Sequence, residues 1–105
     1  STLHSNLSEI QCVNSVKITP LLTMQEVREE GKKMHHCVGG YAASCARGEY
    51  LVFSLTKGEE EATLGISVRD GKYTFNQMYH KYNKVVEDKD FFSTSDAIIK
   101  TLNKR

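Results

Sequence analysis

The feature that most constrains the fold is an Asp70-Gly71 pair between two segments of alternating polarity. Asp-Gly favours a two-residue β-hairpin turn, because both central residues of that turn take a positive φ. The flanking segments 63–69 and 72–79 are therefore predicted to pair as antiparallel strands. Another strand is predicted over 50–56, joined to the hairpin by an acidic turn at 57–61. These strands make a meander at the centre of the chain.

The two-residue turn also fixes which residues of the hairpin lie opposite one another. On the apolar face it predicts three pairs: Val68–Tyr73, Ile66–Phe75 and Leu64–Gln77. Directly opposed residues share a face of the sheet. Gln77 is therefore expected at the end of the face on which the helices pack, where a polar side chain needs a hydrogen-bonding partner.

Helix signals flank the meander. Thr23 and Glu26 form a capping box that begins a helix over 24–34. A second helix is predicted over 36–46, with Gly48 just beyond its end. A third is predicted from a capping box of Ser93 and Asp96, with Phe92 packing against Ala97.

Partial alternation over 13–18 predicts a short strand that Pro20 ends. The predicted fold is therefore α+β. A three- or four-stranded antiparallel meander carries the helices on one face, in the order (β)ααβββα. We expect a single domain over 13–105, preceded by a flexible lead-in or linker over 1–12.

The balance of charges bears on partners and location. The 105 residues include 14 Lys and Arg against 13 Asp and Glu, a net charge of +1 that argues against a general polyanion binder but leaves room for a local basic patch. No apolar run approaches the roughly 20 residues of a membrane span, and no signal peptide is visible. Three cysteines, an odd number, fit a reducing compartment. We expect a cytoplasmic domain without membrane contact.

The least ordinary chemistry lies in Met34-His35-His36-Cys37-Val38-Gly39-Gly40-Tyr41. On the second predicted helix, Cys37, Tyr41 and Cys45 fall on one stripe. A thiol near a helix start with an adjacent histidine, here His36, has the ingredients of a nucleophile. The simpler interpretation is that Cys37 and Cys45 are small core residues, because free cysteine is among the most buried residue types.

A metal site is the second interpretation of the same residues. Its candidate ligands would be His35, His36, Cys37, Cys45 and His80. Their spacing matches no zinc motif, and neighbouring histidines on a helix point about 100° apart. We therefore predict no metal and no cofactor.

Nucleic-acid binding is the third interpretation. Between Arg69 and Lys84 there are four basic residues and one Asp, interleaved with aromatic residues. Basic side chains hold phosphates and aromatic faces stack on unpaired bases. The hairpin register turns Tyr73 and Phe75 inward. The exposed candidates are then Tyr79, His80, Lys81, Tyr82, Asn83 and Lys84.

The order of short motifs resembles a known family. The motifs are Thr19-Pro20-Leu21, Glu30-Gly31, Met34-His35-His36-Cys37-Val38 with Tyr41, Gly48 before a strand, and Gln77-Met78-Tyr79-His80-Lys81-Tyr82-Asn83. Over about residues 16–85 they resemble the PcfJ-like family of plasmid, phage and other mobile-element proteins. That family often has Gln-x-Arg-Gly-x-x-Asn where this chain has Tyr79-His80 in place of Arg-Gly.

The resemblance implies a bacterial or phage origin, a link to mobile DNA, and a longer parent chain with other domains. It carries over five polar positions: His36, Cys37, Tyr41, Gln77 and Asn83. Our leading hypothesis is an accessory domain that contacts nucleic acid or a protein partner in DNA processing. The second is an enzyme, such as a hydrolase or nuclease, with His36, Cys37, Tyr41 and Gln77 as its catalytic pocket. The third is a protein-interaction domain in which these residues form a buried polar network.

Overall fold

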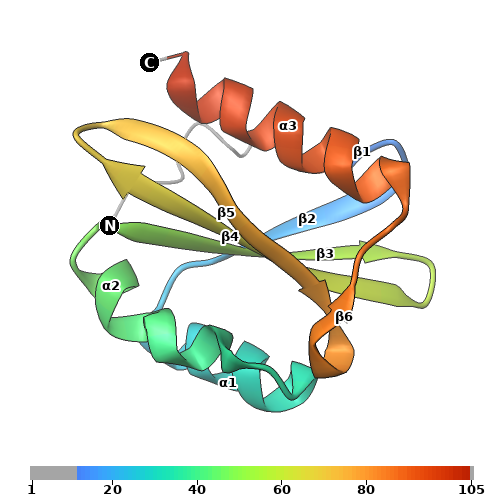
Figure 1. The fold of residues 1–105 in the computed structure, drawn as a ribbon, viewed down its shortest axis with the longest axis horizontal. Coiled ribbons are helices and arrows are strands. Elements are labelled where there is room, and N and C mark those ends of the chain that lie inside the picture. Colours follow the sequence, from blue (N-terminus) through green and yellow to red (C-terminus); the bar gives the residue numbers. More distant parts are fainter. Residues whose placement is uncertain (1–11, 105) are drawn as a thin grey trace.

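A computed structural model describes residues 12–104, in which one antiparallel sheet lies between two layers of helix (Figure 1). The six strands follow one another across the sheet in chain order. The elements are β1 (Cys12–Val13), β2 (Val16–Leu21), α1 (Met24–Met34), η2 (Cys37–Tyr41), α2 (Ala42–Ala46), β3 (Tyr50–Lys57), β4 (Glu60–Arg69), β5 (Lys72–His80), η3 (Lys81–Asn83), β6 (Lys84–Val85) and α3 (Lys89–Asn103).

The predicted α+β class with an antiparallel sheet is confirmed, but two details of the layout are wrong. The sheet has six strands rather than three or four, because β1 and β6 are two-residue strands too short to give a periodic pattern. The helices cover both faces rather than one: α3 lies on one side, and α1 and α2 on the other (Figure 1). Most of the predicted lead-in, residues 1–11, lies outside the described residues.

Alternate residues of β3 supply two separate apolar cores. Leu51, Phe53 and Leu55 face α3 and pack in the larger core with members of β4 and α3. Tyr50 and Val52 face the other way and pack in the smaller core. The larger core includes Leu64, Ile66, Met78, Phe91, Ile98 and Leu102. The smaller core contains Val27, Val38, Ala42, Tyr50 and Val52. A strand buried on both faces has no clean alternation, which is why the two-sided packing was not predicted.

The second strand, β2, runs through Pro20, so the prediction that this proline ends the strand is wrong. β1 pairs with β2 only at Val16 and Lys17, which leaves the rest of β2 with one open edge. Proline is tolerated at such an edge because its missing N–H is not needed by a neighbouring strand.

The helix starts differ in how well local sequence predicts them. The capping box of α1 is confirmed: Thr23 Oγ1 accepts from the Glu26 N–H at 3.1 Å, and Glu26 Oε1 accepts from the Thr23 N–H at 3.1 Å. The capping box predicted at Ser93 is wrong, since α3 begins at Lys89 and Ser93 lies within it. The N-cap is Asp88, whose side chain accepts from the Asp90 N–H at 2.8 Å.

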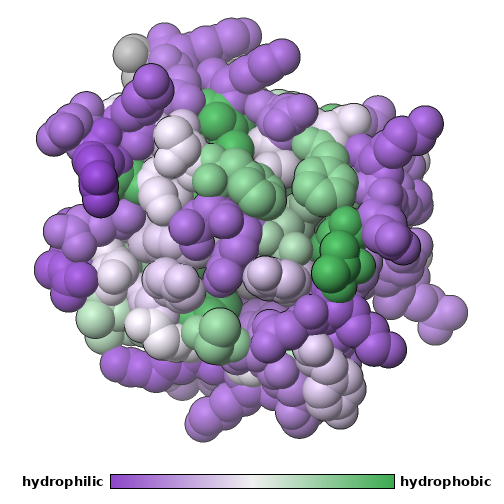
Figure 2. Space-filling model, in the orientation of Figure 1, coloured by the Kyte–Doolittle hydropathy of each residue, from purple (hydrophilic) through white to green (hydrophobic). Residues whose placement is uncertain are grey.

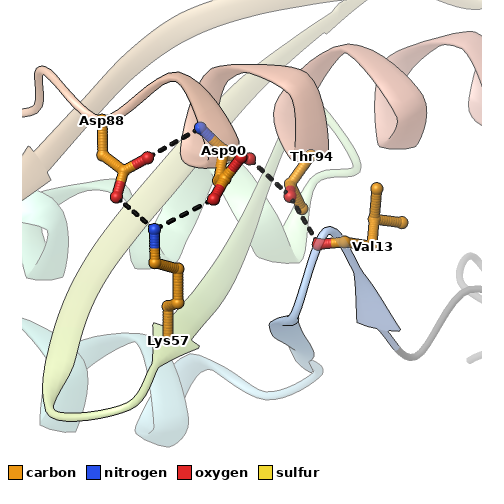
Figure 3. Close-up of polar contacts among 5 residues, drawn as sticks. All are labelled: Val13, Lys57, Asp88, Asp90 and Thr94. Carbon is orange, nitrogen blue, oxygen red and sulfur yellow. Dashed lines mark hydrogen bonds and ion pairs between the residues drawn. The ribbon is translucent and has the colours of Figure 1, made fainter.

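A lysine from the end of β3 fixes this start of α3. Lys57 forms ion pairs with Asp88 and Asp90, and the Thr94 hydroxyl lies between the carbonyl oxygens of Val13 and Asp90 (Figure 3). The hydrogen bond from Lys57 lowers the pKa of Asp88. The position of the cap thus depends on a residue more than thirty positions away.

The hairpin turn has the predicted form, but a bulge interrupts its register. Asp70 and Gly71 have φ of 53° and 75°, and the pairs Val68–Tyr73 and Ile66–Phe75 are confirmed. The next pair is Gly65–Gln77, which leaves Asn76 as an extra residue. The predicted Leu64–Gln77 pair is therefore wrong. Gln77 shares the face of Gly65, the one on which α1 and η2 pack.

The bulge coincides with a contact that only glycine permits. A Cβ at position 65 would lie 2.0 Å from the Tyr50 hydroxyl oxygen, so the phenol ring occupies the space of a side chain. The Tyr50 hydroxyl donates to Asn76 Oδ1 at 2.7 Å. Tyr50 thereby links the smaller core to the bulge.

None of the helices within residues 12–104 has the length and apolar content needed to cross a bilayer.

Candidate functional site

The structure brings several of the predicted polar residues together where η2 meets β4, β5 and η3. They line a cavity of about 10 Å³, room for about one water molecule. Its lining residues are His36, Cys37, Val38, Thr63, Gln77, Tyr79 and Asn83. His36, Cys37, Gln77 and Asn83 were singled out from sequence, whereas Thr63 was not. The cavity itself is too small to enclose a substrate.

Behind the cavity lies a buried polar chain that links three elements. The Thr63 hydroxyl donates to the buried Glu30 carboxylate at 2.6 Å, and His36 Nε2 lies 2.9 Å from the same hydroxyl oxygen. A hydroxyl can donate only one hydrogen bond, and the Thr63 hydroxyl donates its hydrogen bond to the Glu30 carboxylate. Thr63 must therefore accept from His36, which places the imidazole proton on Nε2.

The other ring nitrogen of His36 is also occupied. Nδ1 accepts from the Val38 N–H at 3.4 Å, so His36 caps the start of η2. Burial lowers the pKa of His36, although its own backbone hydrogen bond and the Glu30 charge act in the opposite direction. His36 is thus a neutral ring with both nitrogens engaged, and its role in this geometry is to position η2.

This geometry does not form the cysteine–histidine pair that the nucleophile hypothesis requires. The Cys37 thiol is exposed at the rim of the cavity. Within residues 12–104, no hydrogen bond joins it to a histidine ring, and both nitrogens of the adjacent His36 bond elsewhere. In a cysteine–histidine pair, the histidine activates the thiol through a ring nitrogen that is free to take its proton.

The predicted stripe of Cys37, Tyr41 and Cys45 is confirmed only for Tyr41 and Cys45, which both pack against the smaller core. Cys37 begins a 3₁₀-helix, in which a turn has three residues, so it does not share a face with Tyr41 four positions later. The Tyr41 ring stacks on Tyr50 with centroids 4.2 Å apart, away from the cavity. Cys45 packs against the smaller core, where burial raises its pKa to about 11.

An exposed group of aromatic and basic side chains with one amide, which we call the aromatic patch, lies beside the cavity. Its members are His35, Tyr79, Lys81, Tyr82, Asn83 and Lys84. The rings of His35 and Tyr82 stack with centroids 4.7 Å apart and planes 15° apart, and Lys81 Nζ lies 5.7 Å from the Tyr82 centroid. Tyr82 is 61% exposed. Both stacked residues have positive φ, of 52° and 62°, an uncommon backbone conformation for a bulky residue.

His80 lines a groove together with Lys81, Tyr82 and Lys84 of the aromatic patch, but its ring turns toward the other face of the sheet. It follows Tyr79 on β5 and therefore points to the opposite face. There its Nδ1 lies 2.8 Å from the Glu61 carbonyl oxygen, and its ring meets Phe91 edge-on at 5.6 Å. Sequence reasoning also missed His35, whose partner Tyr82 lies on a distant element.

The described residues contain no group of three or more His, Cys, Asp or Glu side chains arranged to hold a metal ion. The five candidate ligands are separated, with His80 on the other face of the sheet from His36 and Cys37.

Most of this sequence matches the model of one protein family. The model of that family, described as PcfJ-like protein, matches residues 4–93. The chain therefore belongs to the PcfJ-like family, as the order of its motifs indicated. No curated protein and no solved structure matches the chain.

Proposed function

We propose that this chain is an accessory domain of a mobile-element protein and that it contacts nucleic acid through the aromatic patch. The observation that carries the proposal is the exposed stack of His35 and Tyr82, with Lys81 beside it. Aromatic faces stack on unpaired bases, and nearby cations hold the backbone phosphates. A large ring left 61% exposed, on a residue with positive φ, fits a binding role better than a packing role.

Single-stranded nucleic acid fits this surface better than a duplex. The amide side chains of Gln77 and Asn83 lie beside Tyr79 at the cavity, where they can hydrogen-bond the edge of an unpaired base. The acidic residues of the β3–β4 turn border the patch and would repel the second backbone of a duplex.

Fluorescence anisotropy with labelled single- and double-stranded DNA and RNA, measured at several salt concentrations, tests the proposal. We expect single strands to bind more tightly, and Tyr82→Ala to weaken that binding by about 5- to 150-fold, the loss of one base stack. Phe92→Ala is the matched control, because Phe92 is also exposed but lies on α3. Equal losses from both variants, or no binding at low salt, would refute the proposal.

A protein partner in DNA processing is the second candidate. Figure 2 shows apolar surface over β5 and the start of α3, where Phe75 and Phe92 are 46% and 42% exposed with centroids 6.4 Å apart. Exposed apolar patches mark protein contacts more often than nucleic-acid contacts. In this case Phe92→Ala would weaken binding to a purified DNA-processing protein of the same element, while Tyr82→Ala would leave it unchanged.

A further inference from the structure

A second groove adjoins the cavity, between α1 and η2. Its lining residues are Arg28, Gly31, Lys32, His36, Cys37, Gly39 and Gly40. His36 and Cys37 line both hollows, so the groove and the cavity meet at these two residues. A ligand lying across Cys37 would therefore touch both.

The groove carries positive charge that the chain itself does not neutralise. Arg28 and Lys32 are one helical turn apart on α1 and both are exposed. In the described part of the chain neither forms an ion pair, whereas Lys33 pairs with Glu61. Basic side chains clustered on one helix face form an electrostatic footprint suited to nucleic acid.

The groove on the other side of the aromatic patch has the opposite character. It is lined by Met34, Glu59, Glu60, Glu61, His80, Lys81, Tyr82 and Lys84. Its lining has three carboxylates, of which Glu61 pairs with Lys33, whereas the lining of the groove between α1 and η2 has none. A polyanion held at Tyr82 would therefore be drawn toward Arg28 and Lys32 and away from the β3–β4 turn.

Three glycines, Gly31, Gly39 and Gly40, are among the residues that line the basic groove. A Cβ on Gly31 would lie 2.8 Å from the Gly39 nitrogen, so α1 and η2 touch without side chains between them. A Cβ on Gly40 would meet nothing within 4 Å. Glycine at such positions lets a ligand approach the main chain closely.

We propose that the groove between α1 and η2 binds a backbone phosphate of a single-stranded nucleic acid whose neighbouring unpaired base lies against Tyr79 and Tyr82. The proposal rests on the proposed function and adds a path for the strand. Arg28 presents a planar fork of donors suited to phosphate, and Lys32 adds a second charge. The strand crosses the Cys37 rim between its base site and its phosphate site.

The salt dependence of binding provides the first test. For a labelled single-stranded oligonucleotide, Arg28→Gln with Lys32→Gln is expected to reduce the magnitude of the slope of log affinity against log salt by about 0.7, the value for one phosphate contact on a single strand. The control, Lys17→Gln with Lys89→Gln, makes the same change in net charge at exposed positions on β2 and α3. It should leave the slope unchanged.

A variant that fills the groove provides the second test. Gly40 has open space at its Cβ and lacks the positive φ found at Gly48, Gly58 and Gly71, so side chains are tolerated there. Gly40→Glu should bind the strand about fivefold more weakly than its neutral isostere Gly40→Gln at low salt, because its carboxylate would face the phosphate.

The outcomes separate the two proposals. If Tyr82→Ala weakens binding but both groove tests leave it unchanged, the groove proposal is overturned and the nucleic-acid function stands. If the unaltered chain does not bind single strands at low salt, both the nucleic-acid function and the groove proposal are refuted. The groove proposal is also overturned if the Arg28 and Lys32 double variant loses no more binding affinity than the control double variant. The effect would then come from net charge alone.

Discussion

The two faces of the sheet are built in different ways. Toward α3 the sheet presents large apolar side chains, among them Phe53, Leu64 and Ile66, each fully buried. Toward α1 and η2 it presents a smaller core, Thr63, which bonds the buried Glu30 of α1, and Gly65, where the Tyr50 phenol ring fills the space of a side chain. The first arrangement supplies stability, and the second holds a polar cavity in one geometry.

The largest effect we expect is from truncating the α3 face. Phe91→Ala should destabilise the domain by about 3–5 kcal/mol, because a fully buried aromatic ring is lost and leaves a cavity. Phe92→Ala is the control, and it should reduce the free energy of unfolding much less, because the neighbouring Phe92 is 42% exposed. Denaturant unfolding measures both, and similar losses from the two would mean that α3 does not dominate stability.

On the opposite face of the sheet, we expect stability to be most sensitive to substitution at Gly65, which makes the tightest contact there. Gly65→Ala would place a methyl group 2.0 Å from the Tyr50 hydroxyl oxygen, and we expect a loss of about 1–3 kcal/mol as the ring is displaced from Asn76. Gly40→Ala, with no atom within 4 Å of its Cβ, should be close to neutral. Thermal melts of the two variants decide the comparison, and equal melting temperatures would contradict it.

We expect the domain to lose stability when only one member of the buried polar chain is replaced. Thr63→Val removes the hydroxyl that bonds both Glu30 and His36, and we expect a loss of about 1–3 kcal/mol from the unpartnered groups. Adding Glu30→Leu should restore much of that loss, since no buried carboxylate then remains. A double variant less stable than Thr63→Val alone would show that Glu30 has another role.

The smallest expected effect is a pH dependence from His36. Its folded pKa lies below the ordinary value of about 6.5, so protonation favours the unfolded chain. The stability contribution is fully present above about pH 6.5 and declines as the pH falls from there toward the folded pKa. Urea midpoints between pH 5 and 7.5 should show this slope, and His36→Gln should lack it. An identical slope in the variant would assign the effect to another group.

Local signals were sufficient for some of the fold. The Asp70-Gly71 turn and the Thr23–Glu26 cap were predicted because each is formed by residues adjacent in the chain. The start of α3 was missed because Lys57 fixes it from β3. The bulge was missed because its contact with Tyr50 joins residues far apart in sequence.

The candidate site was predicted in part, and not always for the right reason. His36, Cys37, Gln77 and Asn83 do line one cavity, but Gln77 reaches it through the bulge rather than through the predicted register. Glu30 was noted only as part of the Glu30-Gly31 motif and not as a site residue, because a charged residue on an amphipathic helix is usually solvated. Here Thr63 accounts for its burial, and no local pattern pairs the two.

The bulge at Asn76 also affects how sequences of this family should be compared. Compared with a regular hairpin, β5 contains one extra residue, Asn76. A shorter strand that lacked Asn76 would still pair Gln77 with Gly65, so Gln77 and Tyr79 would stay on the face that they occupy here. Counting outward from the turn would therefore misassign every position beyond Phe75 by one. An alignment should be anchored separately on Asp70-Gly71 and on Gln77, with any one-residue gap placed between them.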